Sequence, residues 1–312
     1  MIRAILYNPA IDVHYKIPHL GEQTTFTGLQ NVHYPAGKAV NFAKAVKILG
    51  EEVELSGIIP SNDILKYKTY LDEYKIRHDL SEIPGNTRIN TTIFEEDSGI
   101  SYHLSSENAA VSESAITAFN NKLLGKMQAD DFFVFSGSLP TGCSRETYGK
   151  LIEECKTKGI KTALDSRSNP LKHGIAATPF LISPNETEFQ EIFSADEDIK
   201  GLQHIALKGK RLIDSGIEYV FITLGKDGVV ALSKDESLFC TPIELSNQVN
   251  DVGCGDAFLA GAVVGFKRGF KFSEVCKLAV ASGAANTLTR EPCKIDPSRV
   301  RHIMEKLTVE GI

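Results

Sequence analysis

The sequence lacks the features that mark several large classes of protein. It has no CxxC pair among its 312 residues, so the cysteine spacing fits neither a zinc ribbon nor a small disulfide scaffold. No uninterrupted apolar stretch approaches the roughly 20 residues of a membrane span, and the N-terminal apolar run is too short for a signal peptide. We therefore expect a cytoplasmic protein with reduced thiols at its six cysteines, which are Cys143, Cys155, Cys240, Cys254, Cys276 and Cys293.

An excess of positive charge is also missing. The formal net charge is −6, which disfavours binding to nucleic acid or to an anionic membrane surface. A small anionic ligand is compatible with this charge if its site is locally basic. Hydrophobic residues make up 42% and charged residues 24% of the chain, as in folded globular proteins. Without internal repeats or low-complexity linkers, the length supports one large α/β domain, or a large domain with a small accessory piece.

Short apolar runs alternate with helical patterns along most of the chain. The runs read as buried strands, and they lie at 51–59, 131–138, 161–166, 180–185 and 219–225. Several of the helical patterns between them end in glycine, a common helix stop. This alternation predicts a mostly parallel sheet with helices on both faces. Ligands of such sheets bind beyond the carboxyl ends of the strands.

Two early segments break this alternation. Residues 10–18 and 90–104 alternate in polarity and carry β-branched or aromatic side chains, and the second contains the turn sequence EEDSG. We interpret them as a small β-sheet set apart from the main sheet, in the position of a lid. A decorated edge of the main sheet is the alternative interpretation.

The stretch GCGDAFLAGAVVGF, which begins at Gly253, is the first candidate for chemistry. Gly253 and Gly255 allow a backbone shape that directs several N–H groups at one point. An anion there meets amide donors and the positive end of a helix dipole, and Asp256 could take a proton from an attacking hydroxyl group. The alternative for Asp256 is a plain N-cap after a glycine turn. The Cys254 thiol, at the same helix start, is expected to have a lowered pKa and to react readily.

Two basic residues could bind an anion. Lys38 follows a glycine and precedes a helical pattern, and Asn41, one turn later, faces the same way. Arg88 precedes a strand in which Asn90 lies on the same face, and arginine suits bidentate phosphate recognition. Taken alone, a solvated lysine and an exposed strand arginine are the simpler interpretations.

Two further stretches suit a nucleotide and its metal ion. In SPNETEF, Asn185 and Glu188 are one helical turn apart. They could hold the waters of Mg²⁺, which prefers oxygen ligands and keeps several waters. The same pair can equally form a capping box with Asn185 as N-cap, and the two roles are compatible. The GKDG stretch at 225–228 is either a turn or a flat glycine surface under a nucleotide.

Taken in order, these stretches resemble the motifs of the ribokinase-like, PfkB-type family of carbohydrate kinases. The resemblance covers essentially the whole chain and is closest to the 1-phosphofructokinase and tagatose-6-phosphate kinase branch. It rests on NPAID (8–12), AGKAVNFAKAVKILG (36–50), TRIN (87–90), SGSLPTG (136–142), PNETE (184–188), TLGKDG (223–228) and VGCGDAFLAG (252–261). It implies a three-layer α/β/α sandwich in a single kinase domain, 1–312, with lid strands at about 10–18, 26–35 and 88–104.

The resemblance also implies roles, position by position. Those for the sugar phosphate fall on Asp12, Gly37, Lys38, Asn41, Arg88, Asn90 and Ser138. Those for ATP fall on Asn185, Thr223, Gly225, Gly228 and Asn286, the last near the adenine, and those for Mg²⁺ and its waters on Asn185 and Glu188. An anion hole would be formed by Gly253, Cys254 and Gly255, with Asp256 as the catalytic base. Because the family's lid often makes a dimer contact, the resemblance further implies a homodimer.

The reaction that we expect is phosphoryl transfer from ATP, with Mg²⁺, to a ketohexose phosphate. Fructose 1-phosphate, converted to fructose 1,6-bisphosphate, is the first expectation, with tagatose 6-phosphate and fructose 6-phosphate as alternatives. A sugar-phosphate sensor without turnover is the alternative outside enzymes, and it would tolerate loss of Asp256 or of the Asn185–Glu188 pair. A nucleoside kinase would not need Lys38 and Arg88 for a substrate phosphate.

Overall fold

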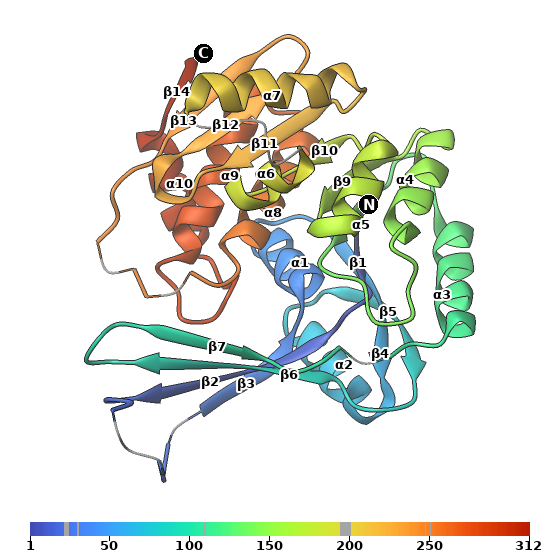
Figure 1. Ribbon diagram of the computed structural model, residues 1–312, viewed down its shortest axis with the longest axis vertical. Helices are drawn as coiled ribbons and strands as arrows, with labels where there is room; N and C mark the ends of the chain where they lie inside the picture. The colour runs from blue at the N-terminus through green and yellow to red at the C-terminus, as the bar shows by residue number, and fades with distance from the viewer. Residues whose placement is uncertain (22–24, 30, 109, 194–200, 247, 250) are drawn as a thin grey trace.

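The main sheet of the computed structural model runs through the centre of the molecule (Figure 1). The structure describes residues 1–21, 25–29, 31–108, 110–193, 201–246, 248–249 and 251–312, and within them this sheet has ten strands. Its parallel strands are, in spatial order, β5 (Arg77–Ile83), β4 (Val53–Pro60), β1 (Ile2–Leu6), β8 (Phe132–Ser136), β9 (Lys161–Asp165), β10 (Leu181–Ile182) and β11 (Tyr219–Thr223). Antiparallel strands continue it as β12 (Val229–Leu232), β13 (Ser237–Thr241) and β14 (Thr308–Gly311). The predicted mostly parallel sheet is confirmed.

Helices cover both faces of this sheet, which confirms the predicted three layers. One face carries α1 (Lys38–Ile48), α2 (Ile64–Glu73), α8 (Cys254–Lys267), α9 (Phe272–Asn286) and α10 (Pro297–Lys306). The other carries α3 (Glu113–Lys126), α4 (Thr147–Thr157), α5 (Ser168–Ala176), α6 (Glu186–Ile192) and α7 (Leu202–Asp214). Two 3-10 turns are η1 (Ser61–Asp63) and η2 (Gly225–Asp227). None of the helices in the described ranges is both long and apolar enough to cross a membrane.

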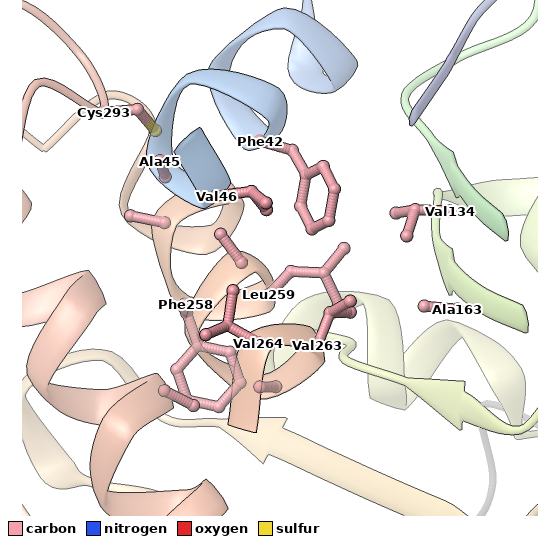
Figure 2. Close-up of a cluster of buried hydrophobic side chains, with 14 of the residues drawn as sticks. Phe42, Ala45, Val46, Val134, Ala163, Phe258, Leu259, Val263, Val264 and Cys293 are labelled. Atoms are coloured by element: carbon pink, nitrogen blue, oxygen red, sulfur yellow. The ribbon is translucent and has the colours of Figure 1, made fainter. Parts of the chain in front are cut away.

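The packing of α1 against α8 sets the position of the candidate site. Phe42 and Val46 of α1 converge with Leu259 and Val263 of α8, and Val134 of β8 lies beside them (Figure 2). All five side chains are fully buried, and each contributes roughly 1.5–3 kcal/mol relative to an exposed position. Because the two helices pack along their lengths, their N-terminal turns meet at the same edge of the sheet.

A second sheet of four strands extends away from the body (Figure 1). Its strands are, in order, β3 (Asn31–Ala36), β2 (Ala10–Ile17), β6 (Arg88–Glu95) and β7 (Ser101–Ser105). It shares no strand with the main sheet in the described residues, so the decorated-edge interpretation is wrong. Of the strand expected over 26–35, the structure shows β3 from Asn31, and Gly28 has a φ of 70°, a left-handed conformation outside regular strands. Residue 30 of that range lies outside the described residues.

Tyr67 ties this second sheet to the body at its base. The hydroxyl group of Tyr67 lies 2.7 Å from Ala10 O in β2 and 2.8 Å from Ala36 O in β3. Tyr67 belongs to α2 and is fully buried. The two strands are therefore held where they leave the body, so that Asp12 of β2 and Lys38, just after β3, extend from a fixed point.

A close helix contact lies on the far side of α8, where Gly261 meets α9. A Cβ atom at Gly261 would lie 2.6 Å from the backbone oxygen of Leu278 and 2.8 Å from Ala279 Cα. These distances are below those of real Cβ contacts, so only glycine allows the two helices to approach this closely. The contact fixes α8 from behind.

Gly261→Ala is expected to destabilise the protein by about 1–3 kcal/mol, because overpacking forces the two backbones apart. Gly125→Ala is the matched control: Gly125 also lies in a helix, but its added Cβ atom meets nothing within 4 Å. That change should stabilise by roughly 0.5–1 kcal/mol through helix propensity. Urea unfolding followed by circular dichroism measures both, and equal effects would contradict the importance of this contact.

Candidate active site

Polar residues gather where the parallel strands of the main sheet end. Ser138 follows β8, Asp165 is the last residue of β9, Asn185 follows β10 and Thr223 ends β11. Asn185 and Thr223 form a bridge between neighbouring chain segments. Because sheets of this kind bind ligands beyond the carboxyl ends of their strands, this edge is the candidate site.

The first turn of α8 presents backbone donors to this edge. Gly253 is the N-cap and has a φ of 82°, in the left-handed region that favours glycine. No side chain caps the helix, so its first amide groups lack the usual capping acceptor. A Cβ atom at Gly255 would meet nothing within 4 Å, which leaves the backbone open on that side. This geometry suits an anion, which the amides and the helix dipole would stabilise.

Asp256 lies in this first turn and is only 5% exposed. Asn41 of α1 donates a hydrogen bond from Nδ2 to Asp256 Oδ2 at 2.9 Å. Burial raises the pKa of Asp256 to about 7, in spite of the Lys38 ammonium, which lowers it, and with a further contribution from Asp165. A carboxyl group with this pKa is matched to general base chemistry near neutral pH. The plain N-cap interpretation is wrong, because Gly253 is the N-cap residue and the Asp256 side chain does not form a capping hydrogen bond.

Lys38 binds a carboxylate that the sequence analysis missed. Its Nζ lies 3.0 Å from Oδ1 and 3.1 Å from Oδ2 of Asp165. Burial lowers the pKa of Lys38, but Asp165, Asp256 and Glu188 together raise it above its usual value, so the ammonium group stays charged. The pattern that could have identified Asp165 is its place at the carboxyl end of the buried strand KTALD. Gly37 precedes Lys38 as the N-cap of α1, which also has no side-chain cap.

Asp12 and Asn90 pair across the second sheet. Asn90 Nδ2 donates a hydrogen bond to Asp12 Oδ1 at 2.8 Å, because β2 and β6 place the two residues in register. Burial raises the pKa of Asp12, whereas Asn90, His14 and Arg88 lower it. Asn90 Oδ1 is buried without a hydrogen-bond partner in the described structure. It is therefore an acceptor ready for a ligand hydroxyl group.

Arg88 and Ser138 both contact the short segment that links β1 to β2. Arg88 is half-buried, and its Nε donates to Pro9 O at 3.3 Å. Ser138 Oγ accepts a hydrogen bond from Asn8 Nδ2 at 2.8 Å. Among the described residues Arg88 forms no ion pair, so its guanidinium charge is available to a ligand.

Asn185 and Glu188 form the capping box that the sequence allows. Asn185 Oδ1 accepts from Glu188 N at 2.9 Å, and Glu188 Oε2 accepts from Asn185 N at 3.0 Å. Burial raises the pKa of Glu188, and Asp165 raises it further, while Lys38 lowers it. No set of three His, Cys, Asp or Glu side chains forms a metal cage in the described ranges. Spaced oxygen groups of this kind fit Mg²⁺, which keeps several waters.

The GKDG stretch forms an open surface beside Thr223. Gly225 and Gly228 have φ values of 60° and 114°. A Cβ atom at Gly225 would meet nothing within 4 Å, whereas one at Gly228 would lie 2.7 Å from Cys240 O. Glycine at 228 thus permits close backbone approach, and glycine at 225 leaves the surface open.

Asn286 lies behind the site rather than on this surface. Its side chain is fully buried, its Nδ2 donates to Val252 O at 2.8 Å, and its Oδ1 accepts from Cys293 N at 2.6 Å. The amide group is used to hold the segment that precedes α8. The expectation that Asn286 contacts an adenine therefore gains no support from this geometry.

The Cys254 thiol does not have the lowered pKa that its place at a helix start suggests. Burial raises its pKa, and Asp251 and Asp256 raise it further, while a hydrogen bond from Asn286 lowers it. The expected lowering is wrong, because burial and the two carboxyl groups outweigh the hydrogen bond from Asn286.

The predicted residues thus fall into neighbouring groups. One group joins Lys38 and Asn41 to Asp256, and Asp165 belongs to it. A second pairs Asp12 with Asn90 in the small sheet, and a third joins Asn185 to Thr223. The arrangement places an acid–base group, amide donors and basic side chains around one edge.

Comparison with protein families gives one match over most of the chain. Residues 4–299 match the description "pfkB family carbohydrate kinase". A 1-phosphofructokinase from Bacillus subtilis is 28% identical over 93% of this chain and 94% of its own length. A tagatose-6-phosphate kinase from Staphylococcus epidermidis is 25% identical over 99% of both chains.

Solved structures give the same fold. Phosphofructokinase-2 from Escherichia coli, in complex with substrates and products, superposes with a TM-score of 0.90 at 21% identity, over 97% of this chain and 98% of that one. A Thermotoga maritima protein described as a possible 1-phosphofructokinase gives a TM-score of 0.85 at 20% identity, over 100% and 99% of the two chains. At these identities the similarity establishes the fold.

Asp256→Asn is expected to raise the free energy of unfolding, and more at pH 8 than at pH 5. The folded-state pKa of about 7 exceeds the usual value near 3.9. The folded chain therefore holds an extra proton between these values, and stability is lost as the pH rises through that window. The neutral amide avoids this loss, so the gain should be larger at pH 8 by about 1–3 kcal/mol. Urea unfolding at both pH values measures it, and equal gains would contradict the raised pKa.

Proposed function

Because the chain belongs to the pfkB family of carbohydrate kinases, we propose that it transfers the γ-phosphoryl group of ATP to a ketohexose phosphate. The substrate that we propose first is fructose 1-phosphate, phosphorylated on its 6-hydroxyl group to give fructose 1,6-bisphosphate. The observation that carries the proposal is Asp256, a buried carboxyl group with a pKa of about 7 at the uncapped start of α8. The relatives that are named 1-phosphofructokinase support the choice of sugar.

The chemical step would centre on the first turn of α8. Asp256 takes the proton of the attacking hydroxyl group, and the new P–O bond forms as the bond to the ADP oxygen breaks. The amide groups from Gly253 to Gly255 stabilise the charge that develops on the transferred phosphoryl oxygens. Asn41 holds the carboxylate of Asp256 in position through the 2.9 Å hydrogen bond.

The phosphate and hydroxyl groups of the sugar would bind between the two sheets. Arg88 and Ser138, which contact the same short segment, would hold the phosphate already present, together with Lys38 and the backbone at Gly37. Asp12 and the unpartnered Oδ1 of Asn90 would bind sugar hydroxyl groups. This division of roles uses positively charged side chains for the phosphate and hydrogen bonds to Asp12 and Asn90 for the hydroxyl groups.

ATP would lie along the open surface formed by Thr223, Gly225 and Gly228. Asn185 and Glu188 would hold Mg²⁺ through its waters. Asp165, which binds Lys38, lies close enough to Glu188 to raise its pKa. When bound, Mg²⁺ supplies charge neutralisation for the phosphate groups. Asn286 would act on the site from behind, by fixing the segment before α8.

A tagatose-6-phosphate kinase is the second candidate, supported by relatives of that name, and fructose 6-phosphate is a third substrate. We further propose that residues 1–312 act as one kinase domain, with the small sheet as its lid over the sugar. The proposed place of action is the cytoplasm, which supplies ATP and fits the free thiols of all six cysteines.

The lid is also the surface through which we propose that two copies associate. One face of the small sheet carries Ile89, Tyr102 and Leu104, which are 50%, 36% and 55% exposed. The register pairs Leu104 with Thr91 and Tyr102 with Ile93, so these side chains share a face with Ile89, opposite the face of Asp12. Exposed apolar groups gathered on one sheet face are typical of an interaction surface.

Leu104→Glu is expected to convert a dimer into a monomer, because it buries a charge in the proposed contact. Sedimentation velocity at micromolar concentration measures the change. Leu207→Glu is the matched control, since Leu207 is 65% exposed in α7, away from the small sheet, and should leave the dimer intact. A monomeric parent protein would remove the proposal.

The substrate is tested by coupled ADP release with Mg-ATP over a panel. The panel contains fructose 1-phosphate, tagatose 6-phosphate, fructose 6-phosphate, ribose and adenosine. We expect kcat/KM for fructose 1-phosphate to exceed the others by about 10²-fold, a difference of roughly 2.7 kcal/mol in transition-state binding. Preference for another phosphoketose would correct the sugar. No turnover of any compound, with ATP still bound, would favour the sensor.

Asp256→Asn is expected to lower kcat by roughly 10²–10⁴-fold with little change in KM, because its role lies in the transition state. In the parent, kcat/KM should fall as the pH drops below about 7, where the carboxylate becomes protonated. Steady-state kinetics from pH 5.5 to 9 measures both effects. Turnover of the variant within tenfold of the parent would rule out Asp256 as the base.

A further inference from the structure

Lys44 is a fully buried lysine that the proposed reaction does not use. It lies in α1, one turn after Asn41, and its side chain is 0% exposed. Its ammonium group lies 5.3–5.6 Å from the ring centroids of Tyr34, Tyr70 and Tyr74, within the range of cation–π attraction. A lysine is almost never this buried unless it is paired.

The partner of Lys44 is Glu291, in the segment between α9 and α10. Glu291 Oε1 accepts hydrogen bonds from Lys44 Nζ at 2.9 Å, from the Tyr70 hydroxyl at 2.9 Å and from the Tyr74 hydroxyl at 2.8 Å. Burial raises the pKa of Glu291, but Lys44 and the two tyrosines lower it to about 2. Burial lowers the pKa of Lys44, and Glu291 opposes this shift; the 2.9 Å contact between the two groups has the geometry of an ion pair. A buried ion pair is a weak source of stability, because desolvation opposes the attraction. We therefore ask which parts of the chain this ion pair holds in place.

The segment that carries Glu291 packs against the start of α8. A Cβ atom at Gly253 would lie 3.0 Å from Pro292 Cβ and 3.3 Å from Cys293 Sγ. Cys293 has a φ of 60°, a left-handed conformation that a non-glycine residue keeps only where its surroundings hold it. Asn286 holds Cys293 through the 2.6 Å hydrogen bond to its N–H group, and the ion pair of Glu291 holds the chain two residues earlier.

The same cage reaches the small sheet. Tyr34 of β3 stacks on Tyr70, with 6.3 Å between ring centroids and 15° between ring planes. The Tyr34 hydroxyl lies 2.8 Å from His14 Nε2 in β2, and Asp12 shares that face of β2 with His14. Lys44 is therefore linked to the small sheet through Tyr34 and to the segment beside Gly253 through Glu291.

We propose that Lys44 and Glu291 are positioning residues that hold the start of α8 in its anion-binding geometry and fix it relative to the small sheet. Each acts through a neighbour, Tyr34 on the side of the sheet and Cys293 on the side of Gly253. The inference rests on the proposed role of the α8 amides in phosphoryl transfer.

The first test replaces both charges by neutral side chains of similar size. Lys44→Met alone leaves the Glu291 carboxylate without its ammonium partner and should lower the unfolding midpoint. The double variant Lys44→Met/Glu291→Gln removes both charges and keeps an acceptor for Tyr70 and Tyr74, so it should regain much of that loss. A positioning role predicts that kcat of the double variant stays at least tenfold below the parent, with KM for both substrates within threefold.

Amide hydrogen exchange gives a second readout that needs no substrate. In the double variant, peptides covering 251–258 should exchange at least threefold faster than in the parent, whereas peptides covering β8 should not change. Lys294→Met is the matched control. Lys294 contacts the other oxygen of Glu291 at 3.3 Å and is 59% exposed, so its loss should change neither kcat nor exchange.

A double variant with parental kcat and parental exchange would overturn the inference, whatever its stability. Faster exchange at 251–258 in a protein that phosphorylates no sugar phosphate would uphold the positioning role and reject the proposed function. If the double variant does not fold, Glu291→Gln alone decides, because parental exchange over the same peptides would then overturn the inference.

Discussion

The hydrogen bond between Asn41 and Asp256 is the contact on which the site depends. It joins the first turns of α1 and α8 at 2.9 Å, and it satisfies a carboxyl group that is otherwise taken out of water. A pKa near 7 means that the fold gives up a few kcal/mol at neutral pH to keep this group ionisable. The apolar packing of α1 on α8, at roughly 1.5–3 kcal/mol for each large side chain, offsets that loss.

Sequence patterns predicted the features that depend on residues close together in the chain. The strands, the capping box of Asn185 and the glycine-rich start of α8 follow from neighbours a few residues apart. Asp165 and Glu291 were missed because their partners, Lys38 and Lys44, are 127 and 247 residues away in the chain. The lowered pKa expected for Cys254 failed for a similar reason, since burial is set by the whole fold.

The charges of the site are unbalanced before any ligand arrives. Asp165, Asp256 and Glu188 all act on the single ammonium group of Lys38, while Arg88 stands further out at the base of the small sheet. A nucleotide and a sugar phosphate would add more negative charge to this edge. A hydrated cation held by oxygen groups such as those of Asn185 and Glu188 would balance part of that charge.

Tyr67 holds the small sheet at its base, so a rotation about this point would move the far end of the sheet more than the base. From Ala10 to Ile17, β2 spans roughly 23 Å at about 3.3 Å per residue, so a rotation of about 5° at the base would displace the tip by about 2 Å. At the same rise per residue, Asp12 is only ~7 Å from the pivot and moves by ~0.6 Å. A small rotation at the base would therefore move the far end of the small sheet several times further than Asp12.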